Sequence, residues 1–177
     1  MNLCAPTVQD VEQVRLWRNN CLETLRTPYP LTKEMQEQFY REVICTRNSK
    51  HRYWSISETE DGIEYMIGFG GLTNIEWENR LAEISLIINP EFRRQGKGEQ
   101  AVELLLREGF NNMNLENIYG ECYETNSMQG FWKKVCDKYS GKAVILPQRK
   151  YWNGKYYDSL YFSINRNKFV LTLSEIL

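Results

Sequence analysis

Residues 83–106 read EISLIINPEFRRQGKGEQAVELLL, and this stretch decides how the chain folds. An apolar run is followed by a proline, two arginines and two glycines, and then by the pattern of an amphipathic helix. The first N–H groups of a helix lack partners within the helix and carry partial positive charge, so they bind phosphate well. Gly96 and Gly98 allow the backbone to approach such a ligand, and Arg93 and Arg94 add positive charge. The stretch therefore predicts a site for a phosphorylated ligand, with a diphosphate as the best fit.

Two known phosphate-binding motifs can be compared with this loop. A P-loop is excluded, because Lys97 is followed by Gly98 rather than by Ser or Thr. Gly96, Gly98 and Ala101 satisfy the dinucleotide-binding pattern G-x-G-x-x-[GA]. However, the seven residues NPEFRRQ separate Gly96 from the apolar strand, where that fold has a tight turn. The preceding strands also have the pattern of an antiparallel meander, which argues against the dinucleotide-binding fold. A third interpretation of the loop is a plain helix cap beside a solvated arginine pair, with no ligand.

The composition is that of an ordinary globular chain. Its 177 residues are 42% hydrophobic with a formal net charge of −1, which predicts a single domain over residues 1–177. The sequence has neither a long basic run nor an acidic tail, so binding to nucleic acid is not expected. The first ten residues do not have the pattern of a signal peptide, and no apolar run is long enough to span a membrane. A cytoplasmic protein without a membrane partner is expected.

Metal and disulfide sites are not expected either. The five cysteines are odd in number and scattered, and no C-x-x-C occurs. His51 is the single histidine and lies in a basic cluster at 47–52 that is expected to be a solvated turn. These facts argue against zinc and against a disulfide framework, and they favour reduced thiols.

The rest of the chain divides into helices and strands at clear boundaries. Thr7 and Asp10 have capping-box spacing, so a helix is expected from about Val8, and Thr32 caps a second one. Asn153-Gly154 is a strong signal for a hairpin turn. Strands are expected at 2–5, 53–58, 65–75, 81–88 and 117–124, helices at 98–112 and 126–136, and a hairpin at 147–164.

This order predicts a mixed α/β sheet of about seven strands, mostly antiparallel, with helices on both faces. Strands joined by short turns should be antiparallel. The helix after Gly98 should return the chain so that strand 117–124 lies parallel to strand 81–88. Residues 165–177 carry no clear pattern and are treated as a C-terminal extension of unknown role.

The loop and its surroundings resemble a known enzyme family. Arg93, Gly96 and Gly98 fill the three defined positions of [QR]-x-x-G-x-[GA], motif A of the GNAT superfamily of acyl-CoA N-acyltransferases. The resemblance implies a single-domain GNAT fold, in which a splayed pair of strands holds the cofactor. Similarity to the branch that contains the ribosomal-protein N-terminal acetyltransferases extends over VRLWRN (14–19), AEISLIINP (82–90), ECYETNS (121–127) and GKYYDSLYFSI (154–164).

The resemblance also implies where acetyl-CoA binds. The pantetheine arm lies between the splayed strands, and the pyrophosphate lies on the motif A loop. Asn126 matches the asparagine of motif B, although Asn is equally suited to cap a helix. Trp132 is the aromatic residue nearest to the usual motif B tyrosine and is included as a cofactor contact. The other residues implied to bind the cofactor are Leu86, Ile87, Ile88, Arg93, Arg94, Gln95, Gly96, Lys97, Gly98 and Glu99.

The usual acid of the family cannot be transferred to this chain. The seventh residue after Asn126 is Lys133 instead of tyrosine, and Asp137 stands where glycine is usual. Tyr139 and Tyr123 are the candidate substitutes. A missing acid would slow the reaction without abolishing it, because releasing an unprotonated thiolate at pH 7 costs only about 2 kcal/mol.

A base is the more demanding requirement, because an ammonium must lose a proton before it attacks. Glu83 is the candidate, since it lies on the motif A strand where several family members carry a catalytic glutamate. A structural ion pair is its alternative role, and Glu121 on the facing strand is a weaker candidate base. Arg18 and Asn19, in the WRN segment, are candidates for the acceptor side.

The resemblance to this family implies an enzyme that moves an acetyl group from acetyl-CoA to a primary amine by direct attack, and nothing in the sequence requires a metal. The acceptor could be a protein N-terminus, an amino sugar or another small amine, and a homodimer is compatible with the sequence. The departure in motif B leaves a second hypothesis open, a CoA-binding module that has lost turnover. A dinucleotide-binding enzyme is the third.

Overall fold

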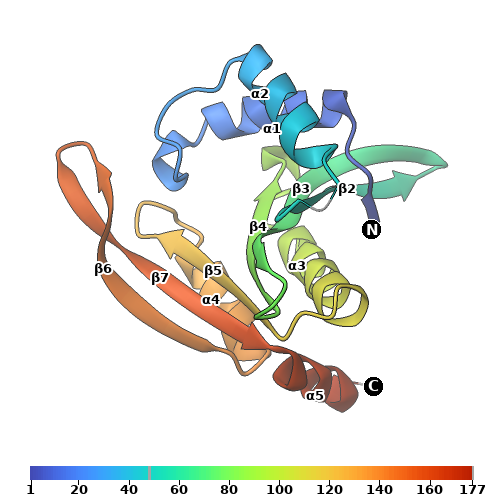
Figure 1. Ribbon diagram of the computed structural model, residues 1–177, viewed down its shortest axis with the longest axis vertical. Helices are drawn as coiled ribbons and strands as arrows, with labels where there is room; N and C mark the ends of the chain where they lie inside the picture. The colour runs from blue at the N-terminus through green and yellow to red at the C-terminus, as the bar shows by residue number, and fades with distance from the viewer. Residues whose placement is uncertain (48, 177) are drawn as a thin grey trace.

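The computed structural model describes residues 1–47 and 49–176 (Figure 1). Its centre is a seven-stranded sheet in the order β1-β2-β3-β4-β5-β7-β6, which confirms the predicted α/β fold. The strands are β1 (Asn2–Cys4), β2 (Arg52–Glu60), β3 (Ile63–Glu76), β4 (Leu81–Ile88), β5 (Asn117–Tyr123), β6 (Lys142–Trp152) and β7 (Lys155–Asn165). The helices are α1 (Val8–Asn19), α2 (Lys33–Phe39), α3 (Lys97–Arg107), α4 (Gln129–Lys138) and α5 (Arg166–Ile176).

The sheet is antiparallel except between β4 and β5. These two strands run parallel and pair over three positions, from Leu81 opposite Asn117 to Glu83 opposite Tyr119. The pairing ends at Glu83, and the rest of β4 diverges from β5 (Figure 1). The expected parallel return through α3 and the expected splayed pair are both confirmed. The divergence opens the sheet directly beside Glu83.

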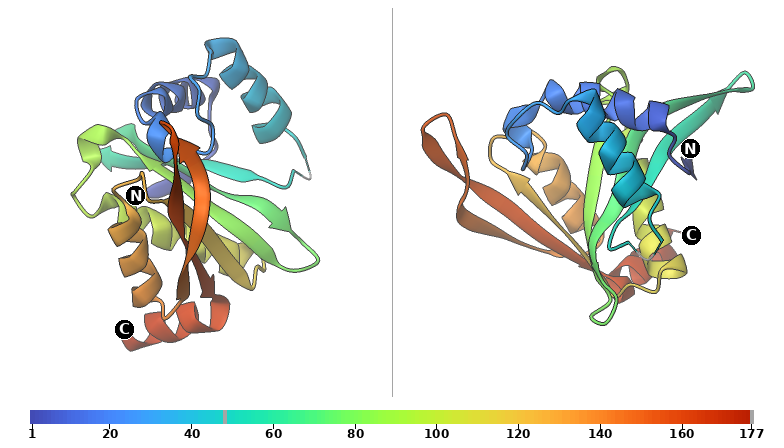
Figure 2. Two further views of the ribbon diagram at one scale, coloured as in Figure 1. Left: turned by 90° about the vertical axis from the view of Figure 1, so that its left-hand side faces the viewer. Right: turned by 45° about the horizontal axis from the view of Figure 1, so that its top comes forward.

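Helices cover both faces of the sheet (Figure 2). On one face α1 packs through Val11, Val14 and Trp17 against Phe69 of β3. Leu72 lies three residues further along β3, on the opposite face, and belongs to the larger core that α3 and α4 cover. None of the helices in the described residues is long and apolar enough to cross a membrane.

Local signals in the sequence are reproduced by the backbone. The Asp10 N–H donates to Thr7 Oγ1 at 3.2 Å and the Thr7 N–H donates to Asp10 Oδ2 at 2.8 Å, which completes the capping box. Thr32 accepts a backbone N–H at 3.2 Å and caps α2. Asn153 and Gly154 have positive φ angles of 47° and 82°, as the tight turn between β6 and β7 requires.

The C-terminal segment forms a helix that the sequence pattern did not indicate. Phe169 of α5 is fully buried against Phe110 and Tyr139, with ring centroids 5.2 and 5.0 Å away. The extension therefore closes one end of the core (Figure 1), while its residue 177 lies outside the described part of the chain. β6 also begins earlier than expected, at Lys142, so the hairpin is a long arm.

Candidate active site

The divergence of β4 from β5 leaves a hollow of about 310 Å³ between them, here called the inner hollow. Its walls include Leu86 of β4, Asn126 before α4 and Trp132 of α4. Trp132 stacks on Phe162 of β7 with ring centroids 5.0 Å apart, which gives the hollow a flat apolar wall. Asn126 also accepts the Met128 N–H at 3.0 Å, so it orders the turn that enters α4. Three of the residues expected to bind the cofactor therefore meet here.

The side chains of Ile87 and Ile88, expected beside the same cofactor arm, pack elsewhere. Ile87 packs against the cluster under α1, whereas Ile88 packs with Ala101 of α3 and is 9% exposed. Successive residues of a strand point to opposite faces, so these neighbours cannot both face one hollow. A contact of either residue with a cofactor arm would be made through its backbone.

The loop before α3 has the backbone geometry that its glycines predicted. Arg94 and Gly96 have positive φ angles of 62° and 76°, so the chain bends sharply into the helix. A Cβ at Gly98 would lie 3.4 Å from the ring of Phe131, so the helix start approaches α4 closely. Phe131 in turn packs edge-on against Trp132 at 5.1 Å. The positively polarised start of α3 is thus connected to the wall of the inner hollow through Phe131 and Trp132, although no residue of the loop lines that hollow.

The charged side chains of this loop differ in what they contact. Arg93 Nε donates to the carbonyl of Ile88 at 3.1 Å and braces the loop. Lys97 pairs with Glu58 of β2 at 2.6 Å. Arg94 is exposed, which leaves its guanidinium accessible to a phosphate. The other polar contacts of the loop join Gln95 to the carbonyl of Glu91 and Glu99 to Lys138.

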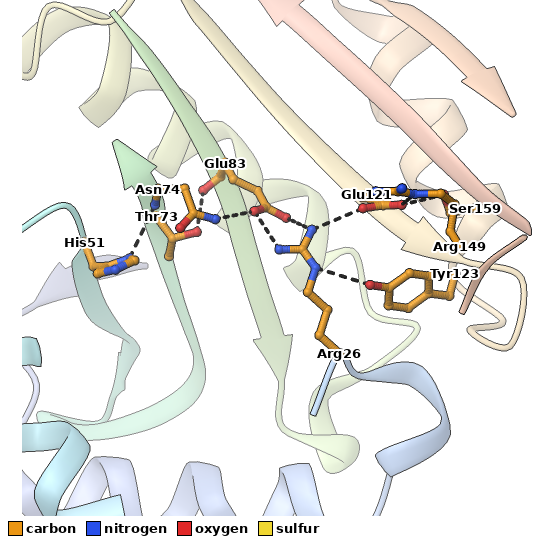
Figure 3. Close-up of polar contacts among 9 residues, drawn as sticks. All are labelled: Arg26, His51, Thr73, Asn74, Glu83, Glu121, Tyr123, Arg149 and Ser159. Atoms are coloured by element: carbon orange, nitrogen blue, oxygen red, sulfur yellow. Dashed lines mark hydrogen bonds and ion pairs between the residues drawn. The ribbon is translucent and has the colours of Figure 1, made fainter. Parts of the chain in front are cut away.

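Glu83 lies where β4 and β5 part, and it is 7% exposed. Figure 3 shows that both of its oxygens accept hydrogen bonds. Arg26 donates from Nη2 to Oε1 at 2.6 Å and from Nη1 to Oε2 at 2.9 Å. Asn74 Nδ2 donates to Oε2 at 2.8 Å. Because the guanidinium grips the carboxylate through two bonds, the orientation of Glu83 is fixed.

Arg26 links Glu83 to the opposite side of the opening. Its Nη2 lies 3.3 Å from Glu121 Oε2, and its Nε donates to the Tyr123 hydroxyl at 3.2 Å. Burial lowers the pKa of the Arg26 guanidinium, but the hydrogen bond and charge of Glu83 outweigh burial, so the pKa is raised overall. Arg26 therefore stays protonated and positively charged between the carboxylates of Glu83 and Glu121.

Glu121 is itself held in place by two further donors. Arg149 Nε lies 2.9 Å and Ser159 Oγ 2.7 Å from its Oε1 (Figure 3). Burial raises the pKa of Glu121, but the bonds from Arg149 and Ser159 lower it by more, so the carboxyl titrates below its usual range. Glu121 is therefore an ionised structural partner, and it is a poorer base than the sequence alone allowed.

A second hollow, of about 580 Å³ and here called the outer hollow, opens on β4, β5 and β7. Tyr119 and Tyr161 stack along it with ring centroids 5.6 Å apart. Its lining residues alternate with the core residues of the same strands, so it lies on the sheet face away from α3 and α4. The residues that line both hollows are Arg26, Asn74, Glu83, Glu121 and Tyr123. The two hollows therefore meet at the Arg26 network.

Arg26 reaches the site from the segment that connects α1 to α2 (Figure 1). This segment contains a 3-10 turn at Leu22–Thr24, and Lys150 of β6 donates its ammonium to two of the segment's carbonyls. Asn19, the last residue of α1, exchanges two hydrogen bonds of 2.9 Å with the backbone of Leu31, which lies near the end of the segment. Asn19, expected on the acceptor side, thus shapes the loop that carries Arg26.

Arg18, the other residue expected on the acceptor side, lines the inner hollow with Arg26. Its Nε is buried and has no hydrogen-bond partner among the residues that the structure describes. Burial lowers the pKa of this guanidinium, whereas the pKa of Arg26 is raised. Arg18 and Arg26 line the same hollow, but carboxylates surround the guanidinium of Arg26, whereas burial dominates the environment of Arg18.

His51 also lines the inner hollow, although the sequence suggested a solvated turn. Its Nδ1 accepts the Asn74 N–H at 3.3 Å, and burial lowers its pKa. It is therefore neutral at pH 7 and supports the residue that holds Glu83. Residue 48, in the same basic cluster, lies outside the described residues.

The two candidate acids lie in different places. Tyr139 ends α4, is fully buried, and donates its hydroxyl to Glu103 of α3 at 3.2 Å. The structure places it in the core between α3 and α5 and does not bring it together with Glu83. Tyr123 lines both hollows and accepts a hydrogen bond from Arg26.

The sequence reading missed Arg26 and Asn74. Asn74 lies where the register between β3 and β4 shifts, with a left-handed φ of 49° that asparagine tolerates better than most residues. An asparagine interrupting an apolar strand was the available signal for it. Arg26 lies in an irregular loop, and its partners are 57 and 95 residues away, so no local pattern marks it.

A family model described as acetyltransferase (GNAT) domain matches residues 1–130. The chain therefore belongs to the GNAT acetyltransferase family, and it is an acetyl-CoA-dependent N-acetyltransferase. No curated protein sequence matches the chain. The antiparallel strands before motif A agree with this family and remove the support for a dinucleotide-binding enzyme.

Solved structures share the whole fold. A spermidine N-acetyltransferase from Vibrio cholerae, in complex with CoA and spermine, is 21% identical with a TM-score of 0.82, and the match covers 96% of this chain and 97% of that one. A dodecameric structure of the enzyme from the same organism in an intermediate state is 21% identical, with a TM-score of 0.76 and coverage of 96% and 95%. At these identities the likeness shows the fold. Membership of the branch that contains the ribosomal-protein N-terminal acetyltransferases stays a prediction.

Proposed function

We propose that this chain acetylates a primary amine that enters through the outer hollow, with Glu83 as the base. One observation carries the proposal: Glu83 lies at the junction of the two hollows, where the pairing of β4 and β5 ends. The inner hollow suits the pantetheine arm and its thioester. An amine in the outer hollow would therefore meet the thioester beside this carboxylate.

In the proposed reaction Glu83 takes a proton from the ammonium form of the acceptor. The freed lone pair attacks the thioester carbonyl carbon, the attacking nitrogen loses a second proton, and the C–S bond breaks to give the amide. The thiolate of CoA leaves and takes up one proton, and the proton on Glu83 is released to solvent. Deprotonation at pH 7 costs about 1.4 kcal/mol for an α-amine and about 4.6 kcal/mol for a lysine-like amine. The base therefore matters more for an alkyl amine.

Arg26 and Asn74 donate one hydrogen bond to Oε1 of Glu83 and two to Oε2, so they use three of the roughly four lone-pair sites of the carboxylate. The second lone pair of Oε1 can therefore accept an N–H of the ammonium, and then its proton, while Arg26 stays in place. Arg26 is also held by Glu121 and Tyr123. In this scheme Tyr123, in place of Tyr139, is the residue that protonates the departing thiolate.

The acceptor is best approached with a panel of amines. Spermidine is its first member, because the solved neighbours are spermidine N-acetyltransferases. A peptide with a free N-terminus and an amino sugar complete the classes that the sequence suggested. A homodimer of this chain also stays a prediction.

Calorimetry with acetyl-CoA, together with a free-thiol assay across the amine panel, tests the proposal. We expect stoichiometric binding of acetyl-CoA and amine-dependent release of CoA thiol. Binding of acetyl-CoA without thiol release on any amine would instead identify a CoA-binding module that has lost turnover.

A further inference from the structure

Arg18 is a cation that the fold places at the site without a counter-ion among residues 1–47 and 49–176. Its Nε is buried and unpartnered, and none of the ion pairs among the described residues includes it. The other arginines near the site differ, because Arg26 contacts Glu83 and Glu121, and Arg149 contacts Glu121. A guanidinium has five N–H donors and stays charged at neutral pH, so its donors need an acceptor.

An unpartnered buried donor is destabilising, and a charged one more so. Such groups persist mainly at sites where something other than the folded chain supplies the partner. The lowered pKa of Arg18, caused by burial, reflects the same lack of a counter-charge. The position of Arg18 on the wall of the inner hollow makes a ligand the natural partner.

The charges around the two hollows narrow the chemistry of that ligand. The lining cations are Arg18, Arg26 and Arg149, and the lining carboxylates are Glu76, Glu83 and Glu121. Arg26 and Arg149 already satisfy Glu83 and Glu121. The lining therefore has no excess of negative charge for a polycation, and its unmatched group in the inner hollow is positive. The thioester oxygen is uncharged and would not neutralise Arg18.

We infer that the acceptor is an amine that also carries an anionic group, a carboxylate or a phosphate, and that Arg18 binds this group. The inference rests on the proposed function and names its class of substrate. A guanidinium binds either anion through two parallel hydrogen bonds. Arg18 lines the inner hollow from α1, on a different wall from Leu86, Asn126 and Trp132. The acceptor would therefore span the junction, with its anion on Arg18 and its amine beside Glu83.

Matched pairs of amines that differ by the anionic group test this inference. 4-Aminobutyrate is compared with butylamine, phosphoethanolamine with ethanolamine, and glucosamine 6-phosphate with glucosamine, and spermidine is the polycation. For the wild type we expect kcat/KM to favour the anionic member of at least one pair by about 10- to 100-fold, the effect of a hydrogen bond to a charged group. The carboxylate and phosphate pairs distinguish the two anions.

Variants at this position separate binding of the acceptor from a structural role. Arg18→Gln should abolish the preference by raising KM for the anionic amine, with KM for acetyl-CoA unchanged. Arg18→Lys should retain part of it, because an ammonium keeps the charge and loses the paired hydrogen bonds. Arg41→Gln is the matched control, since Arg41 is exposed on the surface beyond α2. Removal of an unpaired buried charge should leave Tm equal to or above that of the wild type.

The outcomes separate this inference from the proposed function. Equal rates within every pair, a preference for spermidine, or a preference that survives Arg18→Gln would overturn the inference while acetyl transfer stands. A fall of Tm by several degrees in Arg18→Gln would show a structural role and overturn it as well. Failure of every amine to release CoA would remove the proposed function, and the inference with it.

Discussion

The two sides of the β4–β5 gap are built in different ways. On the proposed cofactor side a continuous stretch, residues 93–98, turns into α3 and offers mainly backbone donors. The proposed acceptor side is assembled by tertiary structure from side chains on separate segments, namely Arg26, Asn74, Glu83 and Glu121, which line both hollows, and Arg18 of the inner hollow. Recognition through backbone depends on a local conformation that many sequences adopt, whereas recognition through side chains depends on each residue. We therefore expect substitutions on the two sides to affect different kinetic constants.

The largest expected effect is on the acceptor side, at the proposed base. Glu83→Gln should lower kcat about 10²- to 10⁴-fold, the usual contribution of a general base, because glutamine cannot take the proton. The dissociation constant of acetyl-CoA, measured by calorimetry, should stay as in the wild type. Unchanged turnover across pH would show that Glu83 has only a structural role, and it would contradict the expected difference between the two sides of the gap.

The next effect distinguishes two tyrosines. Tyr123→Phe should lower kcat about 10²-fold if the hydroxyl at the junction protonates the thiolate. Tyr139→Phe should leave kcat unchanged and cost about 1 kcal/mol of stability, because it loses the buried bond to Glu103. Steady-state kinetics and thermal melts of the two variants decide the point, and a larger loss of kcat in Tyr139→Phe would reverse the assignment.

A smaller effect is expected on the cofactor side. Gly96→Ala places a Cβ at a φ of 76°, and left-handed backbone costs an L-residue about 1–2 kcal/mol. KM for acetyl-CoA should rise up to about tenfold, while KM for the amine is unchanged. Gly154→Ala is the control, since its φ of 82° imposes similar strain in a hairpin away from the loop. If both variants raise KM for acetyl-CoA equally, strain rather than phosphate binding is responsible.

The smallest effect concerns the pH dependence of stability at Glu121. Its pKa in the folded state is lowered, so its ionised form stabilises the fold above the pKa of an unfolded glutamate, about 4.3. This stabilisation is lost as pH falls through the lower folded pKa. Arg149→Gln should therefore lower Tm slightly at pH 7, and the difference from the wild type should shrink as the carboxyl protonates in acid. A difference that is independent of pH would contradict the assigned ion pair.

Sequence reasoning succeeded where the controlling interactions are local. The Thr7 capping box, the Asn153-Gly154 turn and the glycine loop before α3 each depend on a few neighbouring residues, and each was confirmed in the backbone. It could not separate the two candidate acids, Tyr139 and Tyr123, because sequence position does not say which layer a helix end enters, and the structure places Tyr139 in the core. The helix at the C-terminus was missed for a related reason, since Phe169 and Leu173, which hold it against the core, pack through contacts distant in sequence.

The sequence by itself determined the seven strands, the helices before residue 165 and the glycine turn before α3, because strand alternation and helix termini obey short-range rules. The splayed parallel pair was implied by the family resemblance. Only the tertiary structure decided that Arg26 crosses the opening to hold Glu83 and Glu121, and that the Nε of Arg18 is buried without a hydrogen-bond partner among the described residues. Charges interact through space over a few ångströms, whereas these partners lie tens of residues apart in the chain. Their pairing therefore exists only after the sheet and its connecting loop have folded.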